Sequence, residues 1–374
     1  MKLTIIGNNW FPSHPGGLDR YVYELIHHLI PLGTDVNLYG LDLPSSAPGQ
    51  SLHLRPLASK ADSFFTRLYS AYQALDHLPK SCPEAINLHF ALYGFTALPH
   101  LPRNVPVVCT FHGPWALESQ QEGDSLWGVW LKHQLEAFVY RRCDRFIVLS
   151  KAFGHILNQD YGIPWDAIRV IPGGVDTQRF CPHLSRRQAR DLLGWPNDRF
   201  ILFTPRRLVS RMGLDKLINA IAQLQEKNDL WLAIAGKGPL RDALEAQVTA
   251  LNLSHSVHFL GFLPDEQLPL AYQAADLTIM PSQSLEGFGL VLLESLASGT
   301  PVLCTPIGGM PEVITDFSPN LITASPSESD LAVTLRDILT GHLSLPNRHD
   351  CRDYASTHFN WTTIAQRVKQ VFQE

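Results

Sequence analysis

Short apolar segments alternate with longer amphipathic segments along most of the chain, and this alternation constrains the fold more than any other feature. A short apolar run between polar or glycine residues is typical of a strand that is buried on both faces. An amphipathic segment between two such runs is typical of a crossover helix, which parallel strands require. The sequence therefore predicts an α/β protein built from doubly wound parallel sheets.

Two series of apolar runs divide the 374 residues, a length typical of two domains. They predict strands at 3–7, 35–39, 86–90, 105–110, 146–150 and 168–172, and then at 200–203, 231–235, 257–260, 277–280 and 302–304. Pro172–Asp176 (PGGVD) has the composition of a linker. We therefore predict an N-terminal domain at 1–173, a second domain at 174–355 and a terminal helix at 356–374, whereas residues 45–83 give no clear strand order.

The overall composition argues against several classes of protein. Lys and Arg number 30 against 35 Asp and Glu, and this acidic balance disfavours broad binding to nucleic acid. The six cysteines form no C-x-x-C pair, so neither a zinc ribbon nor a disulfide framework is predicted. There is no 18-residue apolar run, and the first residues do not resemble a signal peptide. We expect a soluble, cytoplasmic protein.

The most informative stretch is Ser284–Glu294 (SLEGFGLVLLE), which follows a predicted strand. Its glycines allow a ligand to approach the backbone, and the apolar run after Gly289 predicts the start of a helix. Amide groups at a helix start can bind a diphosphate, while Glu286 and Glu294 can accept hydrogen bonds from a sugar and a ribose diol. The alternative is that both carboxylates are solvated surface groups.

Three arginines, Arg206, Arg207 and Arg211, follow the first predicted strand of the second domain. Ligands of α/β proteins bind beyond the carboxyl ends of parallel strands, and guanidinium groups suit phosphate oxygens. A solvated basic turn is the alternative interpretation.

Two features of the first domain are candidates for ligand contact. Gly16 and Gly17 lie at a predicted strand-to-helix turn, where they could approach a phosphate or could serve only as a tight turn. His112 ends the segment TFHG after another strand. A single histidine is more often structural, but its place at the sheet edge favours ligand contact. Ser-His-Asp, H-E-x-x-H and Walker patterns are absent.

The segment Leu126–Arg145 predicts a basic amphipathic helix. Its tryptophans, leucines and terminal arginines could contact a membrane surface. A helix packed in the core with a basic end is the favoured interpretation.

On these residues, the sequence resembles the retaining glycosyltransferases of family 4, which have the GT-B fold. The most specific likeness is the E-x7-E element from Glu286 to Glu294, followed by ASGTPV at 297–302, which resembles the family's A-x-G-x-P-V. Other similar segments are PGGLDRYVYEL at 15–25, TFHG at 110–113, FIVLSKAF at 146–153, IPGGVD at 171–176, AGKGPLR at 235–241 and GFLPDEQLPLAYQAADLTIMPS at 261–282.

The resemblance implies two Rossmann-like domains that face a cleft, with the acceptor on the first domain and a nucleotide-sugar donor on the second. It also implies that the terminal helix returns to the first domain. The implied catalytic residues are His112, Arg207 and Glu286. The implied donor-binding residues are Gly16, Gly17, Arg206, Arg207, Arg211, Glu286, Gly287, Phe288, Gly289, Leu290 and Glu294.

By position, Arg207 would bind the diphosphate, Glu286 the sugar and Glu294 the ribose, with the base near 260–263. The sequence departs from the family's G-R-L and later Lys: Arg206 takes the glycine position and Met212 the lysine position. Arg211, one residue earlier, is the candidate replacement for that lysine. Smaller departures are Asp19 in place of Glu and Gly173 in place of Asn.

The expected activity is a retaining, metal-independent transfer of a hexose to a hydroxyl of a sugar, lipid-linked or small-molecule acceptor. UDP-hexose is the favoured donor and GDP-mannose the alternative. No cofactor is expected, because the nucleotide sugar is a substrate and no D-x-D element is present. Peripheral contact with the inner face of a membrane is a further hypothesis. The alternatives are a catalytically silent nucleotide-sugar-binding protein, a nucleotide-sugar epimerase and a Rossmann-type oxidoreductase, although the G-x-G-x-x-G of the last is missing.

Overall fold

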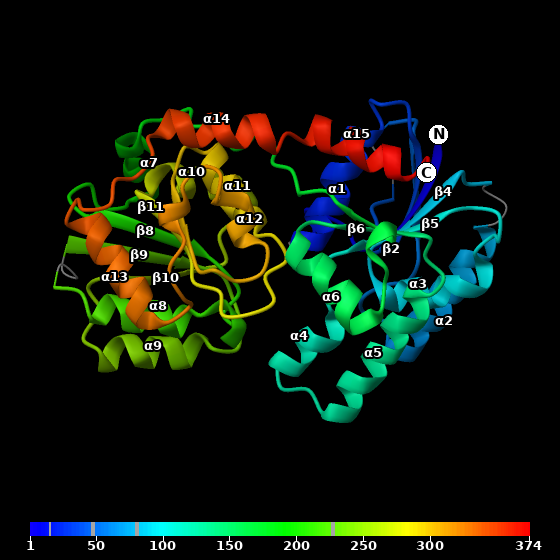
Figure 1. Ribbon diagram of the computed structural model, residues 1–374, viewed down its shortest axis with the longest axis horizontal. Coiled ribbons are helices and arrows are strands. Elements are labelled where there is room, and N and C mark those ends of the chain that lie inside the picture. Colours follow the sequence, from blue (N-terminus) through cyan, green and yellow to red (C-terminus); the bar gives the residue numbers. More distant parts are fainter. Residues whose placement is uncertain (15, 46–48, 79–81, 226–228) are drawn as a thin grey trace. The chain divides into compact units, whose positions relative to one another are not determined.

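The computed structural model describes residues 1–14, 16–45, 49–78, 82–225 and 229–374. Pro15, the first residue of one segment noted above, lies outside the described residues. The chain forms two compact units, the first made of Met1–Gly173 with Trp361–Glu374 and the second of Gly174–Asn360 (Figure 1). Among the helices of the described residues, none combines the length and apolar character needed to cross a membrane.

The first unit contains a seven-stranded parallel sheet in the order β3-β2-β1-β4-β5-β6-β7. Its strands are β1 (Lys2–Asn9), β2 (Asp35–Leu41), β3 (Leu52–Pro56), β4 (Ala85–Leu88), β5 (Val107–Phe111), β6 (Arg145–Val148) and β7 (Ile168–Val170). The sequence pattern missed β3. It is an edge strand, and Leu52 is its one fully buried residue, so it has no continuous apolar run.

Helices cover this sheet: α1 (Gly17–Leu29), α2 (Phe64–Ala74), α3 (Ala91–Ala97), α4 (Trp115–Gln121), α5 (Leu126–Tyr140), α6 (Lys151–Tyr161) and α15 (Trp361–Val371). The last of these comes from the C-terminal end of the chain and packs on α1. The rings of Trp361 and Tyr21 lie 5.2 Å apart edge to face, and Lys369 Nζ donates to the carbonyl of Leu32 at 2.5 Å. Glu374 pairs with Arg169, so charge also holds the chain end in this unit.

The second unit contains a five-stranded parallel sheet in the order β10-β9-β8-β11-β12. Its strands are β8 (Phe200–Pro205), β9 (Leu230–Ala235), β10 (Val257–Gly261), β11 (Leu277–Met280) and β12 (Val302–Cys304). Its helices are α7 (Arg186–Leu193), α8 (Leu214–Ala222), α9 (Arg241–Ala250), α10 (Leu268–Ala274), α11 (Leu290–Ala297), α12 (Met310–Ile314), α13 (Glu328–Leu339) and α14 (Arg348–His358). Each of the five strands predicted here is present.

Each sheet has one point where the strand order reverses direction. In the first unit β1 lies between β2 and β4, and in the second β8 lies between β9 and β11. The loops after such a pair of strands leave in opposite directions and open a crevice at the carboxyl edge, where α/β proteins bind ligands. The topology therefore marks the ends of β1 and β4, and of β8 and β11, as candidate binding positions.

Candidate active site

The reversal point of the second sheet brings together two residues that are 80 positions apart. Arg206 follows β8, and Glu286 lies in the loop after the neighbouring strand β11. Arg206 Nη2 donates to Glu286 Oε2 and to Ser282 Oγ, and Ser282 Oγ lies 3.3 Å from the same carboxylate oxygen. Ser282 was not among the residues predicted from the sequence, because a serine after a strand indicates no function unless its partner is known.

This ion pair is buried. The side chain of Arg206 is 7% exposed and that of Glu286 is 13% exposed. Burial raises the pKa of Glu286, but the charge and hydrogen bond of Arg206, the charge of Arg211 and the hydroxyl of Ser282 lower it, and the net pKa lies below the usual value. Glu286 is therefore an anion at neutral pH and is not the solvated loop residue of the alternative interpretation.

The other basic residues differ in exposure. Arg207 is exposed at the surface, whereas Arg211 is buried and its Nη1 donates to the carbonyl of Leu285 at 3.1 Å. Met212, which holds the position of the family's lysine, is 5% exposed and belongs to the core. The structure therefore places the guanidinium of Arg211, and not the side chain of Met212, against the loop that carries Glu286.

Two glycines permit the backbone packing around this pair. A Cβ atom at Gly308, where φ is +58°, would lie 1.8 Å from the carbonyl oxygen of Glu286. A Cβ at Gly236 would lie 1.9 Å from the carbonyl oxygen of Arg206. Because no side chain can fit at either position, these glycines hold the two neighbouring turns against the ion pair.

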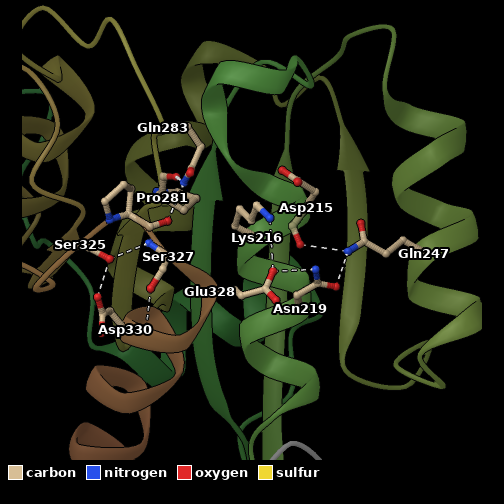
Figure 2. Close-up of polar contacts among 11 residues, drawn as sticks. Asp215, Lys216, Asn219, Gln247, Pro281, Gln283, Ser325, Ser327, Glu328 and Asp330 are labelled. Carbon is tan, nitrogen blue, oxygen red and sulfur yellow. Dashed lines mark hydrogen bonds and ion pairs between the residues drawn. The ribbon is translucent and has the colours of Figure 1, made fainter.

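A polar network anchors the start of the same loop, as Figure 2 shows. Gln283 Nε2 donates to the carbonyl of Pro281 at 2.8 Å and to that of Pro326 at 3.0 Å. Pro326 precedes α13, whose first turn is capped by Ser327 through the amide of Asp330. The loop is thus tied at its base to the segment that leads into α13.

The loop ends at the N-terminus of α11. Gly289 adopts a left-handed conformation with φ of +82°, and the helix begins at Leu290 without a side-chain cap. Phe288 is buried and its ring packs 5.9 Å from that of Phe359, so Phe288 can offer a ligand only its backbone. Glu294 is 6% exposed, and its Oε2 accepts a hydrogen bond from the Tyr272 hydroxyl at 2.8 Å. Glu294 is thus a buried carboxylate and not the exposed helix residue of the alternative interpretation.

The candidates of the first unit lie near the reversal point of its sheet. His112 directly follows β5 and is partly exposed, and His89 directly follows β4. The two rings are hydrogen bonded, with 2.8 Å between His89 Nδ1 and His112 Nε2. His89 was not predicted as a site residue, because the apolar pattern places it inside a strand expected to extend to residue 90.

The glycines at the start of α1 have no structural need to be glycine. Gly16 has an extended backbone with φ of −176°, which any residue can adopt. A Cβ atom at Gly17 would meet no described atom within 4 Å. The loop is closed instead by Asp19, whose carboxylate accepts from the backbone and the side chain of Asn9.

The predicted residues thus form two groups, each within its own unit. In the described part of the chain, no group of three or more His, Cys, Asp or Glu side chains could hold a metal ion. The fold and these groups define a class of α/β protein that presents polar side chains beyond the reversal point of each of two parallel sheets.

Comparisons with known proteins identify the family. A family model described as "Glycosyl transferases group 1" matches residues 185–358, and one described as "Glycosyltransferase Family 4" matches residues 15–179. D-inositol 3-phosphate glycosyltransferase of Corynebacterium aurimucosum is 32% identical over an alignment of 393 positions that covers 96% of this chain and 91% of that protein. The chain therefore belongs to the group 1, family 4 glycosyltransferases.

Two further comparisons gave a sequence match to part of a longer protein and a structural match. Mannosylfructose-phosphate synthase of Agrobacterium fabrum is 32% identical over 252 residues, 63% of this chain but only about half (54%) of that protein. The structure of sucrose-phosphate synthase from Thermosynechococcus elongatus superposes with a TM-score of 0.82 at 23% identity and covers 100% of this chain and 98% of that one. This second likeness shows the shared GT-B fold.

Replacing Arg206 should test the buried pair. Arg206→Ala leaves the Glu286 carboxylate buried without its main partner, so we expect a loss of about 3–5 kcal/mol in the free energy of unfolding, measured by urea denaturation. In the variant, burial without the arginine raises the pKa of Glu286. Lowering the pH should therefore protonate Glu286 and reduce the loss in the free energy of unfolding. The double variant Arg206→Met with Glu286→Gln should recover much of the stability.

The matched control for this experiment is Arg187→Ala, since Arg187 is an exposed arginine of α7. Its replacement should change the free energy of unfolding by less than about 0.5 kcal/mol. Equal stability of Arg206→Ala and the parent protein would contradict the prediction that the buried Glu286 carboxylate needs Arg206 as its partner.

Proposed function

We propose that this protein transfers a hexosyl group from a nucleotide sugar to a hydroxyl group of an acceptor, with retention of anomeric configuration and without a divalent metal. UDP-hexose is the favoured donor, with GDP-mannose as the alternative. The acceptor is a sugar, a lipid-linked glycan or a small molecule. The observation that carries the proposal is the buried, anionic Glu286, paired with Arg206, beyond the reversal point of the second sheet.

The two oxygens of Glu286 have different roles in this proposal. Oε2 is occupied by Arg206 and Ser282, whereas Oε1 accepts no hydrogen bond from any residue that the structure describes. The pair therefore holds the carboxylate rigidly and leaves one oxygen to accept a hydrogen bond from a hydroxyl of the donor hexose. A fixed acceptor of this kind orients the sugar before the reaction begins.

Negative charge develops on the diphosphate as the bond to the sugar breaks, and most of the catalytic effect comes from groups that stabilise it. Arg207 is exposed beyond β8, where its guanidinium can donate two hydrogen bonds to phosphate oxygens. The amides of 287–290 at the start of α11 supply a second, fixed dipole. Glu294, farther along α11, would accept hydrogen bonds from the ribose.

Arg211 takes the role of the family's lysine in this proposal. Its guanidinium lies against the loop of Glu286, and its charge lowers the pKa of that carboxylate. The identity of Met212 supports the same assignment, because a methionine packed in the core carries no charge and no donor for a phosphate oxygen. The catalytically silent nucleotide-sugar-binding protein remains the alternative, favoured by this same loss of a lysine.

In the first unit, His112 would contact the transferring sugar, and Gly16 and Gly17 would approach the phosphates. The open space around Gly17 supports this role, since packing within the described residues does not require a glycine there. A bound phosphate that approaches the backbone closely would require one.

A second feature of the first unit favours membrane contact. Ten large apolar residues are exposed on three helices, and we call this set the aromatic surface: Phe64, Phe65, Tyr69 and Tyr72 of α2, Phe95 of α3, and Leu126, Trp127, Trp130, Leu131 and Phe138 of α5. Helix α3 packs against both α2 and α5 (Figure 1). In α5 the buried residues are Glu136, Val139 and Tyr140, so the favoured core-packed interpretation is wrong for most of this helix.

The chemistry of the aromatic surface fits the headgroup layer of an anionic membrane. Tryptophan and tyrosine prefer that layer, and a basic residue beside them is attracted to anionic lipids. The one charged residue of α2 is Arg67, whose guanidinium lies 5.9 Å from the ring centroid of Phe64. We therefore propose peripheral contact through this surface, in keeping with a lipid-linked acceptor.

Donor binding and the role of Arg207 can be tested together. Thermal unfolding with UDP, GDP, ADP and their hexose conjugates, with magnesium or with EDTA, should show selective stabilisation by one nucleotide that does not need metal. Arg207→Ala should lower kcat about 100-fold, and Arg187→Ala should leave it unchanged.

The outcomes distinguish the alternatives. Binding of a nucleotide sugar without transfer or hydrolysis would favour the silent binding protein, and production of an isomerised nucleotide sugar would favour the epimerase. A kcat of Arg207→Ala within about twofold of the parent value would refute the role of Arg207.

The replacement of the lysine by Arg211 predicts a specific loss of donor affinity. Arg211→Ala should raise the Kd for the donor about 10-fold or more, as expected for a lost charge-assisted hydrogen bond, and Met212→Leu should not change it. Isothermal titration with the nucleotide found above measures both values. Unchanged affinity in Arg211→Ala, in protein of normal thermal stability, would contradict the role.

Membrane contact can be tested by flotation. The parent protein should float with vesicles that contain anionic phosphatidylglycerol and much less with neutral vesicles, and Trp127→Ser with Trp130→Ser should abolish this. Leu192→Ser with Val333→Ser removes two exposed apolar residues of the second unit and serves as the control. No flotation of the parent protein would end this proposal, and concentration-dependent mass in sedimentation without lipid would assign the surface to self-association.

A further inference from the structure

Two histidines are paired at the carboxyl ends of the adjacent strands β4 and β5. His89 Nδ1 lies 2.8 Å from His112 Nε2, and the ring planes are 26° apart with centroids separated by 5.1 Å. This distance is that of an N–H···N hydrogen bond, so one ring donates and the other accepts. The position of the hydrogen in one ring therefore determines its position in the other.

Both rings are uncharged at neutral pH. His89 is 3% exposed, and burial together with the neighbouring His112 lowers its pKa well below the usual value. Burial lowers the pKa of His112 to about 3. Each neutral ring carries a single hydrogen on one of its two nitrogens, so only two arrangements of the pair are possible.

The surroundings of His89 distinguish these two arrangements. If His112 donates, His89 must carry its hydrogen on Nε2, which is buried and has no hydrogen-bond partner among the described residues. If His89 donates from Nδ1, its Nε2 carries no hydrogen and is an acceptor for which the described residues offer no partner. A buried N–H group without a partner is rarer in proteins than an unsatisfied acceptor.

We propose that His89 is a positioning residue that donates to His112 Nε2 and so holds the hydrogen of His112 on Nδ1. His112 Nδ1 has no hydrogen-bond partner among the described residues, and the residue is partly exposed. In this tautomer His112 is a hydrogen-bond donor, and it recognises an oxygen atom of the ligand. Under the proposed function, on which this assignment of the ligand rests, that oxygen belongs to a hydroxyl of the transferring hexose.

The tautomer can be read directly by long-range ¹H–¹⁵N NMR of protein labelled with ¹⁵N-histidine, at pH 7 and without ligand. The His112 signal is assigned by its loss in His112→Asn. We expect the protonated nitrogen of His112 to be Nδ1 in the parent protein. In His89→Phe, where the donor is lost, we expect the hydrogen to move to Nε2, the position that neutral histidine favours in water. His89→Asn keeps an amide donor near the site of Nδ1 and should retain the parent tautomer.

The matched control is His100→Phe, which removes another buried histidine of the same unit and should leave His112 unchanged. Under the proposed function, His89→Phe should lower kcat/KM about five- to tenfold, the effect of one neutral hydrogen bond, and His89→Asn should restore most of it.

Two NMR results would overturn the proposal: a parent His112 protonated at Nε2, or a tautomer that does not change in His89→Phe. If His89→Phe does not fold, the parent spectrum and His89→Asn decide the question. Because the NMR result needs no activity, absence of sugar transfer would refute the proposed function and leave the tautomer assignment intact.

Discussion

The buried pair of Arg206 and Glu286 depends on one constraint, the adjacency of β8 and β11 in a parallel sheet. Those strands are far apart in the sequence, and the helices between them must cross over the sheet before the two carboxyl ends can meet. Once they meet, a guanidinium and a carboxylate that would each be costly to bury alone satisfy one another. The surrounding turns fit closely enough to require glycine at Gly236 and Gly308. The loop that begins α11 therefore has a fixed position before any ligand arrives.

The first sheet has a similar pair of side chains at the carboxyl ends of adjacent strands. There β4 and β5 bring His89 behind His112, as β8 and β11 bring Arg206 beside Glu286. In both cases one member of the pair is buried and forms a hydrogen bond with one polar atom of its partner. The other polar atom of that partner, Nδ1 of His112 or Oε1 of Glu286, bonds to no described residue. A group held in this way recognises a ligand with little loss of side-chain entropy, which is why such pairing suits a binding site.

The departures from the family pattern have a physical explanation in this structure. Arg206 stands where the family has glycine, and its long side chain reaches the carboxylate of Glu286 rather than solvent. Met212 stands where the family has lysine, and it fills the core while Arg211 lies against the Glu286 loop. The two differences concern one small region, so they are better understood as one rearrangement of charge than as separate losses.

The sequence by itself determined the class of fold, eleven of the twelve strands of the described residues and the chain positions of the polar candidates, because apolar periodicity and glycine turns are local properties. It did not reveal β3, since that strand (LHLRP) has no continuous apolar run, nor the exposure of Trp127 and Trp130, since periodicity does not say which face of a helix is covered. Only the tertiary structure decided that Arg206 occupies Glu286 Oε2, that Ser282 joins them and that His89 supports His112. Except for the contact between Ser282 and Glu286, these contacts join residues from different loops, and their distances depend on strand order, which no local pattern encodes.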